Sequence, residues 1–247
     1  MKKLVIITGV SQGIGNALAR YFIDQSFLVW GIGRRDMEEI QNDQRSRYRF
    51  WERDLSDVES MEKWTESCLN QLPENLEELY FIHNAGTLEP MHLTGHLDEK
   101  SLISSIQLNL TSVMILSNVF IRKTQSQPIR KRILVISSGA GKNPYIGWAA
   151  YCSTKAGVDM FVRVMAEEQQ TQEFPVEVIS FAPGIVDTAM QEKIRATPKE
   201  QFPMLDKFVE LKEQGLLAHP ADVAPVIFTY LTQEKVENGI ILDIRDL

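Results

Sequence analysis

Cysteine and positive charge are both scarce in this chain. Its 247 residues contain two cysteines, Cys68 and Cys152, too few for a disulfide framework, so we expect free thiols. Acidic residues outnumber basic ones by 33 to 26, which gives a formal net charge of −7. Nucleic acids and anionic membranes attract basic surfaces, so this balance argues against both as partners. The one basic stretch, residues 129–133, is interpreted as a solvated lead-in to a strand.

Long apolar runs and metal-ligand clusters are absent from the sequence as well. No apolar run approaches the roughly 18 residues of a membrane span. The N-terminal apolar run ends at Thr8, too early for a signal peptide. His92 and His96 are spaced by one helical turn, but no third ligand follows nearby, so no metal site is predicted. We expect a cytoplasmic protein with a small-molecule ligand.

Short apolar segments alternate with segments of helical periodicity along the whole chain. The predicted buried strands are residues 3–8, 27–32, 48–53, 78–83, 132–137, 176–181 and 239–244. The predicted helices between them include residues 14–25, 58–71, 101–124, 154–171 and 221–232. This alternation predicts an α/β fold: a Rossmann-like, doubly wound parallel sheet of about seven strands with helices on both faces. No linker or repeat interrupts it, so residues 1–247 are expected to form one domain.

Residues 188–218 depart from this alternation. The stretch is amphipathic, is broken at Pro198 and Pro203, and leaves the carboxyl end of the sixth predicted strand. Ligands of doubly wound sheets lie at that edge. We therefore expect a small helical substrate lid, with a plain surface hairpin as the alternative.

A glycine-rich turn, TGVSQGIG at residues 8–15, joins the first predicted strand to the first predicted helix. In that setting Gly9 permits a tight turn, Gly13 lets the backbone approach a pyrophosphate, and Gly15 allows the helix to pack closely on the strand. The amide groups and dipole of the helix N-terminus then face the anion. The turn predicts a dinucleotide site.

The end of the second predicted strand indicates which dinucleotide binds. An acidic residue there holds the ribose hydroxyls of NAD, whereas arginine accommodates a 2′-phosphate. The sequence has Arg34 and Arg35 at this place, before Asp36, which is interpreted as the start of the next helix. Guanidinium groups suit a phosphate dianion, so we expect NADP(H) rather than NAD(H).

Seven motifs, taken in order, resemble those of the classical short-chain dehydrogenase/reductase family from end to end. They are TGVSQGIG at 8–15, RDLSD at 53–57, NAG at 84–86, QLNLTSV around Asn109, ISS at 136–138, YCSTK at 151–155 and PGIVDT at 183–188. The resemblance implies an NAD(P)-binding Rossmann fold. It also implies an NADP-dependent oxidoreductase that interconverts CH–OH and C=O groups.

The resemblance implies a catalytic set of Ser138, Tyr151, Lys155 and Asn109. Charge that builds on a carbonyl oxygen during hydride transfer needs an oriented donor and a proton. Tyr151 would supply the proton, and Lys155, one turn away, would lower its pKa and bind the nicotinamide ribose. Ser138, thirteen residues before Tyr151, would orient the carbonyl. Asn109 would hold a water that relays protons to Lys155.

The resemblance also implies a set of cofactor contacts. Among them, Asp54 would contact the adenine and Thr188 the nicotinamide carboxamide. The full expected set is Thr8, Gly9, Ser11, Gln12, Gly13, Ile14, Gly15, Arg34, Arg35, Asp54, Leu55, Asn84, Ala85, Gly86, Tyr151, Lys155, Pro183, Gly184, Val186 and Thr188. One departure is Gln12, which stands where many NADPH-using members carry a basic residue, so the preference for NADPH depends on the two arginines.

Further segments resemble the branch of the family that contains sepiapterin reductases and benzil reductases forming (S)-benzoin. They are GWAAYC at 147–152, APGIVDTAMQ at 182–191 and the tail ILDIRDL. This implies a ketone or vicinal dicarbonyl substrate, benzil-like or pterin-like. Trp148 and Met190, with Tyr145 and Phe202, would line an apolar substrate pocket or else pack as core.

The tail carries the carboxylate that matters most for the choice of substrate. By resemblance Asp243 would anchor the amino groups of a pterin; alternatively it only ends the last strand, and Asp246 is a second candidate.

Two other functions are alternatives to this one. A non-catalytic, NADPH-binding regulatory protein would typically have lost Tyr151 or Lys155, and an extended epimerase or dehydratase would be longer. Members of the family commonly form homodimers or homotetramers through the two long helices, here near 101–124 and 154–171.

Overall fold

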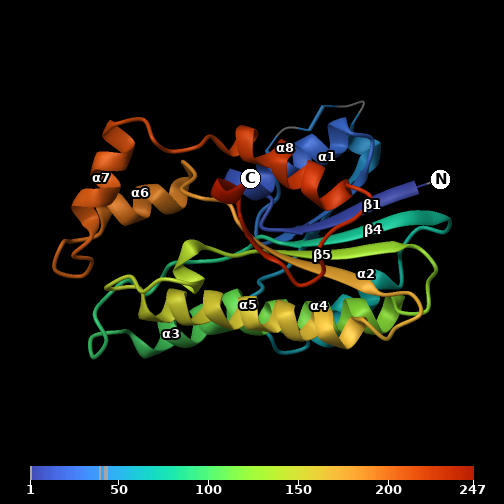
Figure 1. The fold of residues 1–247 in the computed structure, drawn as a ribbon, viewed down its shortest axis with the longest axis horizontal. Coiled ribbons are helices and arrows are strands. Elements are labelled where there is room, and N and C mark those ends of the chain that lie inside the picture. Colours follow the sequence, from blue (N-terminus) through green and yellow to red (C-terminus); the bar gives the residue numbers. More distant parts are fainter. Residues whose placement is uncertain (1, 39, 42–43) are drawn as a thin grey trace.

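A single parallel sheet organises the chain (Figure 1). The computed structural model describes residues 2–38, 40–41 and 44–247. Its seven strands are β1 (Lys2–Thr8), β2 (Leu28–Gly33), β3 (Tyr48–Glu52), β4 (Leu76–His83), β5 (Arg130–Ile136), β6 (Val176–Ala182) and β7 (Ile241–Asp243). They lie in the order β3-β2-β1-β4-β5-β6-β7, and every neighbouring pair is parallel. The predicted doubly wound sheet is confirmed.

Helices cover both faces of the sheet. They are α1 (Gly13–Asp24), α2 (Met61–Leu69), α3 (Glu99–Ile106), α4 (Ser112–Thr124), α5 (Ala149–Gln169), α6 (Ala189–Ala196), α7 (Leu205–Glu213) and α8 (Pro220–Thr232). In Figure 1, α1 and α8 lie on one side of the sheet and α3, α4 and α5 on the other. The helix expected over 101–124 begins earlier, as α3, and a short π-helical turn, Gln107–Thr111, separates α3 from α4.

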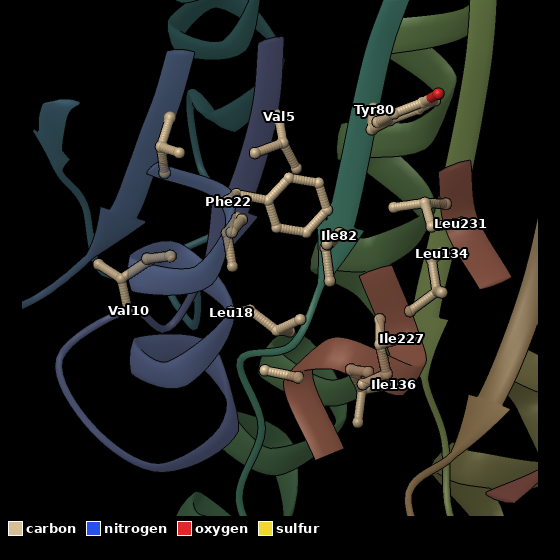
Figure 2. Close-up of a cluster of buried hydrophobic side chains, with 14 of the residues drawn as sticks. Val5, Val10, Leu18, Phe22, Tyr80, Ile82, Leu134, Ile136, Ile227 and Leu231 are labelled. Atoms are coloured by element: carbon tan, nitrogen blue, oxygen red, sulfur yellow. The ribbon is translucent and has the colours of Figure 1, made fainter. Parts of the chain in front are cut away.

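The central strands are buried on both faces, as a parallel sheet between helices requires. Side chains alternate along each strand: on β1, Val5 packs into the core under α1 and α8, whereas Leu4 packs into the core on the opposite face. Figure 2 shows the first of these cores, where Phe22 of α1 and Ile227 of α8 lie over Val5 and Ile82. These clusters hold the carboxyl ends of β1 and β4 side by side.

Two consecutive cations on β5 fasten helix ends to the sheet. The ammonium of Lys131 donates to the carbonyl of Thr124 at the end of α4, at 2.9 Å. The guanidinium of Arg132 donates to the carbonyl of Leu231 in α8 at 2.6 Å and pairs with the carboxylate of Glu177 at 2.7 Å. Both residues are almost completely buried. The interpretation of residues 129–133 as solvated was therefore wrong, because helix-terminal carbonyls attract cations into the interior.

One helical stretch, Glu99–Thr124, is long and apolar enough by composition to cross a membrane, with a mean hydropathy of 1.4, although no uninterrupted apolar run of that length occurs. The same composition is found in core helices of soluble proteins. Here Leu116 and Phe120 pack against the sheet in the core formed with α2 and α5. The apolar character of the stretch is thus used at least partly for packing.

The chain after β6 forms an excursion that extends beyond the sheet (Figure 1). A bridge between Val186 and Ala218 closes its base, and α6 and α7 lie between these two points. Phe202 and Phe208 of the excursion pack against Trp148, which precedes α5. Aromatic packing therefore fixes this segment near the carboxyl ends of the strands.

Candidate active site

A cavity of about 710 Å³ lies at the carboxyl ends of the strands. Its lining includes Gly9 after β1, Asn84 after β4, Ser138 after β5 and Pro183 after β6. Strand order reverses between β1 and β4, and this switch point is where doubly wound sheets bind ligands. Motifs that are far apart in the sequence thus meet around one space.

The glycine-rich turn forms one end of the cavity. Gly9 and Gly13 have φ angles of +75° and +59°, a region that side chains disfavour. A Cβ atom on Gly15 would lie 2.1 Å from the carbonyl oxygen of Gly9, so only glycine permits this contact. Helix α1 begins at Gly13, and the Gln12 side chain does not cap it. The open amides of this helix end fit the pyrophosphate of a dinucleotide.

Thr8 ties this turn to the segment after β4. Its hydroxyl accepts hydrogen bonds from the amides of Asn84 at 2.9 Å and Ala85 at 3.0 Å. The side-chain amide of Asn84 donates in return to the carbonyls of Thr8 at 3.0 Å and Gly9 at 3.1 Å. Thr8 is buried and does not itself line the cavity. It positions the two turns that do.

Arginine side chains stand at the next part of the cavity. Arg34 and Arg35 both line it, together with Asp54, whose carboxylate is 4.0 Å from the Arg34 guanidinium. The Asp36 carboxylate is bound by the Tyr48 hydroxyl at 2.5 Å and by the amide of Met37 at 2.7 Å. Arg34 and Arg35 therefore line the cavity, whereas Asp36 does not. Two guanidinium groups at this place would suit a phosphate group of the ligand.

Most of the expected cofactor residues line the cavity. They are Gly9, Ser11, Gln12, Ile14, Arg34, Arg35, Asp54, Leu55, Asn84, Ala85, Gly86, Tyr151, Lys155, Pro183, Gly184, Val186 and Thr188. Thr8, Gly13 and Gly15 are outside this lining and shape the turn from behind.

Three of the expected catalytic residues meet at the middle of the cavity. Ser138 follows β5 in an extended conformation, while Tyr151 and Lys155 lie on one face of α5. The Lys155 ammonium is 5.5 Å from the centroid of the Tyr151 ring and donates to the Ile136 carbonyl at 2.7 Å. Tyr151 and Lys155 are both largely buried.

Burial dominates the ionisation of this pair. It raises the pKa of Tyr151 to about 12, against a hydrogen bond with Ser138 that lowers it. It lowers the pKa of Lys155 to about 8, against the charge of Asp159, which raises it. The sequence led us to expect a Tyr151 pKa below its ordinary value; in the structure desolvation of the phenolate outweighs any such effect. At pH 7 the phenol keeps its proton and the lysine is mostly charged.

Asn109 lies behind this group and does not line the cavity. It is in the π-helical turn between α3 and α4. Its side chain accepts from the amide of Thr87 at 2.8 Å and donates to the carbonyl of Thr87 at 2.8 Å. These two bonds fasten the segment after β4 to the helix. A role of Asn109 in holding a water remains a prediction.

Aromatic residues surround the far end of the cavity. Trp148, Met190 and Tyr145 line it, and Phe208 reaches it from α7. Phe202 is completely buried behind Trp148, with ring centroids 4.9 Å apart and planes within 3° of parallel. Three rings, those of Tyr145, Trp148 and Phe208, therefore give this end an apolar wall suited to an aromatic ligand, and Phe202 supports Trp148 from behind.

Asp243 ends β7 and does not line the cavity. Both of its carboxylate oxygens are bound by Arg245, through Nε at 2.7 Å and Nη2 at 2.5 Å. The backbone amide of Arg245 donates to the same carboxylate at 3.0 Å. Arg245 itself does line the cavity. The tail thus presents a guanidinium where the sequence interpretation placed a carboxylate.

Several lining residues were not foreseen from the sequence. Gln191 is largely buried, and its side-chain oxygen has no hydrogen-bond partner among the described residues. The Trp148 indole nitrogen and the Ser137 hydroxyl likewise have no hydrogen-bond partner among the described residues. Gln191 is the last residue of the segment APGIVDTAMQ at 182–191 and follows Met190 directly, and this position was the available signal. Arg245 belongs to the tail ILDIRDL, in which only the carboxylates were considered as ligands, and Lys207 lies in no motif.

Comparisons with known proteins agree with this geometry. The family model of short chain dehydrogenases matches residues 3–199. Benzil reductase ((S)-benzoin forming) from Bacillus cereus is 41% identical over 99% of this chain and 100% of its own length. Sepiapterin reductase from Mus musculus is 30% identical over 98% of this chain and 96% of its own length. The crystal structure of the KRED1-Pglu enzyme, 26% identical, superposes with a TM-score of 0.83 over 96% of this chain and 99% of that one. The chain therefore belongs to the short chain dehydrogenase family and is an oxidoreductase of alcohol and carbonyl groups.

Proposed function

We propose that this protein reduces a ketone or vicinal dicarbonyl to the corresponding alcohol with NADPH. The observation that carries the proposal is the meeting of Ser138, Tyr151 and Lys155 in the cavity that also reaches the glycine-rich turn. A nicotinamide bound along that cavity would bring its ring to these three side chains. The family model and the benzil reductase relatives support the reaction class.

NADPH, when bound, supplies a hydride, that is, two electrons and one hydrogen nucleus, to the carbonyl carbon. The carbonyl oxygen takes a proton from the Tyr151 hydroxyl, so the products are an alcohol and NADP⁺. The Ser138 hydroxyl donates a hydrogen bond to the same oxygen and stabilises the charge that builds on it. The Lys155 ammonium stabilises the phenolate left on Tyr151 until a proton from solvent replaces the one transferred. Asn109 holds the neighbouring loop in place.

Selectivity for NADPH over NADH depends on Arg34 and Arg35. Their side chains line the cavity beyond the glycine-rich turn, where the adenosine ribose would lie. A 2′-phosphate would receive charge-assisted hydrogen bonds from them. Asp36, the residue that could instead bind ribose hydroxyls, is occupied by Tyr48.

The substrate is a compact aromatic carbonyl compound, and a benzil-like vicinal dicarbonyl fits best. The wall of Tyr145, Trp148 and Phe208 suits flat rings, and the Bacillus cereus relative is named for benzil reduction. A pterin would depend on Asp243 to accept from its amino groups. Arg245 already takes both oxygens of that carboxylate, so sepiapterin is the weaker candidate.

Two features of the molecule complete the proposal. Residues 188–218 act as a substrate lid, since α6 contributes Met190 and α7 contributes Phe208 to the cavity. The protein forms a homodimer or homotetramer, for which the exposed Met114 on α4 and Met160 and Val164 on α5 provide an apolar face.

A cofactor oxidation assay tests this proposal. The purified protein is mixed with NADPH or NADH and with benzil, a quinone or sepiapterin, and absorbance at the reduced nicotinamide band is followed. We expect NADPH oxidation with benzil and a far lower kcat/KM with NADH. Tight NADPH binding without oxidation by any carbonyl compound would instead indicate a regulatory NADPH-binding protein.

A further inference from the structure

The substrate end of the cavity is cationic as well as aromatic. Lys100 of α3, Lys207 of α7 and Arg245 of the tail all line the cavity, whereas Glu89 is the one carboxylate from that part of the lining. Neither Lys100 nor Lys207 forms an ion pair with another described residue. The arginines that suit the cofactor phosphate, Arg34 and Arg35, follow β2 instead. A second positive region therefore adjoins the substrate.

Arg245 is the most precisely placed of these cations. Its Nε and Nη2 atoms grip the two oxygens of Asp243, whose side chain is only 9% exposed, whereas the Arg245 side chain is 66% exposed. The guanidinium is rigid and planar, so this fork also fixes the direction of Nη1. Nη1 makes no hydrogen bond within the described part of the chain. The Nη1 group of Arg245 is thus an oriented donor at the cavity, with no acceptor among the described residues.

The position of this donor relates it to the reacting carbonyl. The Nη2 atom of Arg245 lies 3.6 Å from the point that a Cβ on Gly139 would occupy. Gly139 directly follows Ser138, the residue assigned to the carbonyl oxygen. The guanidinium therefore lies beside Gly139, on the same side of the cavity as Ser138.

We propose that Arg245 is a specificity-determining residue that binds a carboxylate carried by the substrate. The inference rests on the proposed function and narrows its substrate class to aromatic ketones or vicinal dicarbonyls that carry a carboxylate. Lys207, on the lid, adds positive charge from another side of the cavity. Asp243 is a positioning residue: it orients the guanidinium and has no direct contact with substrate.

The same arrangement disfavours substrates that present N–H donors. A guanidinium has five donors and no acceptor, so an amino group of a heterocycle finds no partner at Arg245. The acceptor that could bind such a group, the Asp243 carboxylate, is covered by the same arginine. Removal of Arg245 would reverse this preference by exposing the carboxylate.

The test compares benzil with 4-carboxybenzil, which differ by one carboxylate. Wild-type kcat/KM should be about tenfold higher for 4-carboxybenzil than for benzil, because one additional charge-assisted contact stabilises the bound substrate modestly. In Arg245→Gln that ratio should fall to about one. Lys142→Gln is the matched control, because Lys142 also lies near Asp243 but does not line the cavity. It should keep the wild-type ratio.

Calorimetry separates failure of this inference from failure of the proposed function. If neither compound is reduced, the proposed function fails, and the affinities of the two compounds for the NADPH-loaded protein still report on Arg245. Equal wild-type affinity and equal kcat/KM for the two compounds would overturn the inference. An undiminished preference in Arg245→Gln would overturn it as well. In Arg245→Ala we expect a lower KM for sepiapterin than in the wild type.

Discussion

The Lys155 ammonium lies 5.5 Å from the centroid of the Tyr151 ring, and its hydrogen bond to the Ile136 carbonyl holds it on that side of α5. Burial separates the pKa values of the two groups, raising that of Tyr151 to about 12 and lowering that of Lys155 to about 8. The neutral phenol is thus preserved as a proton donor at physiological pH, and the lysine loses its charge within reach of mild alkali.

The rate of carbonyl reduction should fall as pH rises through about 8. Lys155 is charged below its pKa of about 8 and neutral above it, so the stabilisation of the phenolate is lost on the alkaline side. The negative charge of Asp159 raises the pKa of Lys155, so Asp159→Asn should move this alkaline limb to lower pH. The measurement is a profile of kcat against pH with saturating NADPH.

Glu167→Gln is the matched control for that shift, because Glu167 also belongs to α5 but is exposed. Its profile should superimpose on the wild-type one. An alkaline limb that stays in place in Asp159→Asn would contradict the role given to Lys155.

Replacement of Arg132 should destabilise the fold. Arg132→Met leaves the Leu231 carbonyl and the Glu177 carboxylate without their buried partner, and breaking a buried ion pair costs about 3–5 kcal/mol. Urea denaturation should show this loss in the free energy of unfolding. Arg130→Met, on the same strand but in a looser, 3.7 Å pair with Glu78, should cost less than about 1 kcal/mol. Equal losses of unfolding free energy in the two variants would contradict the stabilising role given to the buried contacts of Arg132.

Cofactor selectivity should depend on the paired arginines. Arg34→Ala combined with Arg35→Ala removes charge-assisted hydrogen bonds worth about 1.5–3 kcal/mol each. The kcat/KM for NADPH should fall at least about tenfold and that for NADH should change little. Arg45→Ala, an exposed arginine outside the cavity lining, should leave both values unchanged. An unaltered NADPH to NADH ratio in the double variant would mean that the arginines do not bind the 2′-phosphate.

The lid should loosen when its aromatic stack is cut. Phe202→Ala removes the ring that is stacked on Trp148, and loss of a buried phenylalanine costs about 3–5 kcal/mol. We expect KM for benzil to rise about tenfold, while the dissociation constant of NADPH is preserved. Phe228→Ala, which removes a ring of α8 that packs against Phe22 of α1 and lies outside the cavity lining, should lower stability without this change in KM. Similar KM effects in both variants would argue against a lid.

Much of the fold could be predicted from the sequence because apolar periodicity reports burial directly. Segments such as 3–8 and 78–83 became β1 and β4 within two residues of their expected ends. The exception on β5 is instructive. Lys131 and Arg132 carry charge, yet they are buried because the ends of α4 and α8 offer carbonyls there, and no local pattern in the sequence shows those distant carbonyls.

The site divides in the same way. Glycine conformation and the spacing within YCSTK are local properties, so the sequence could predict that Gly9, Tyr151 and Lys155 belong to one site, and in the structure all three line the same cavity. The tail was harder to predict. Whether Asp243 faces the cavity depends on a short turn that folds Arg245 back onto it, and such a contact has no periodic signature. Gln191 was missed because glutamine is usually a surface residue, and most other glutamines of this chain are indeed exposed or half-buried.

The proposed carbonyl reduction depends above all on Tyr151 as the proton donor, and kcat for NADPH-dependent benzil reduction by Tyr151→Phe tests this role most directly. We expect kcat to fall by about 10²- to 10⁴-fold, with the dissociation constant of NADPH, measured by nicotinamide fluorescence, close to the wild-type value. Tyr145→Phe, which loses a hydroxyl from the same cavity, should retain most of its activity. Near-normal turnover by Tyr151→Phe with intact NADPH binding would contradict the role of Tyr151 as the proton donor.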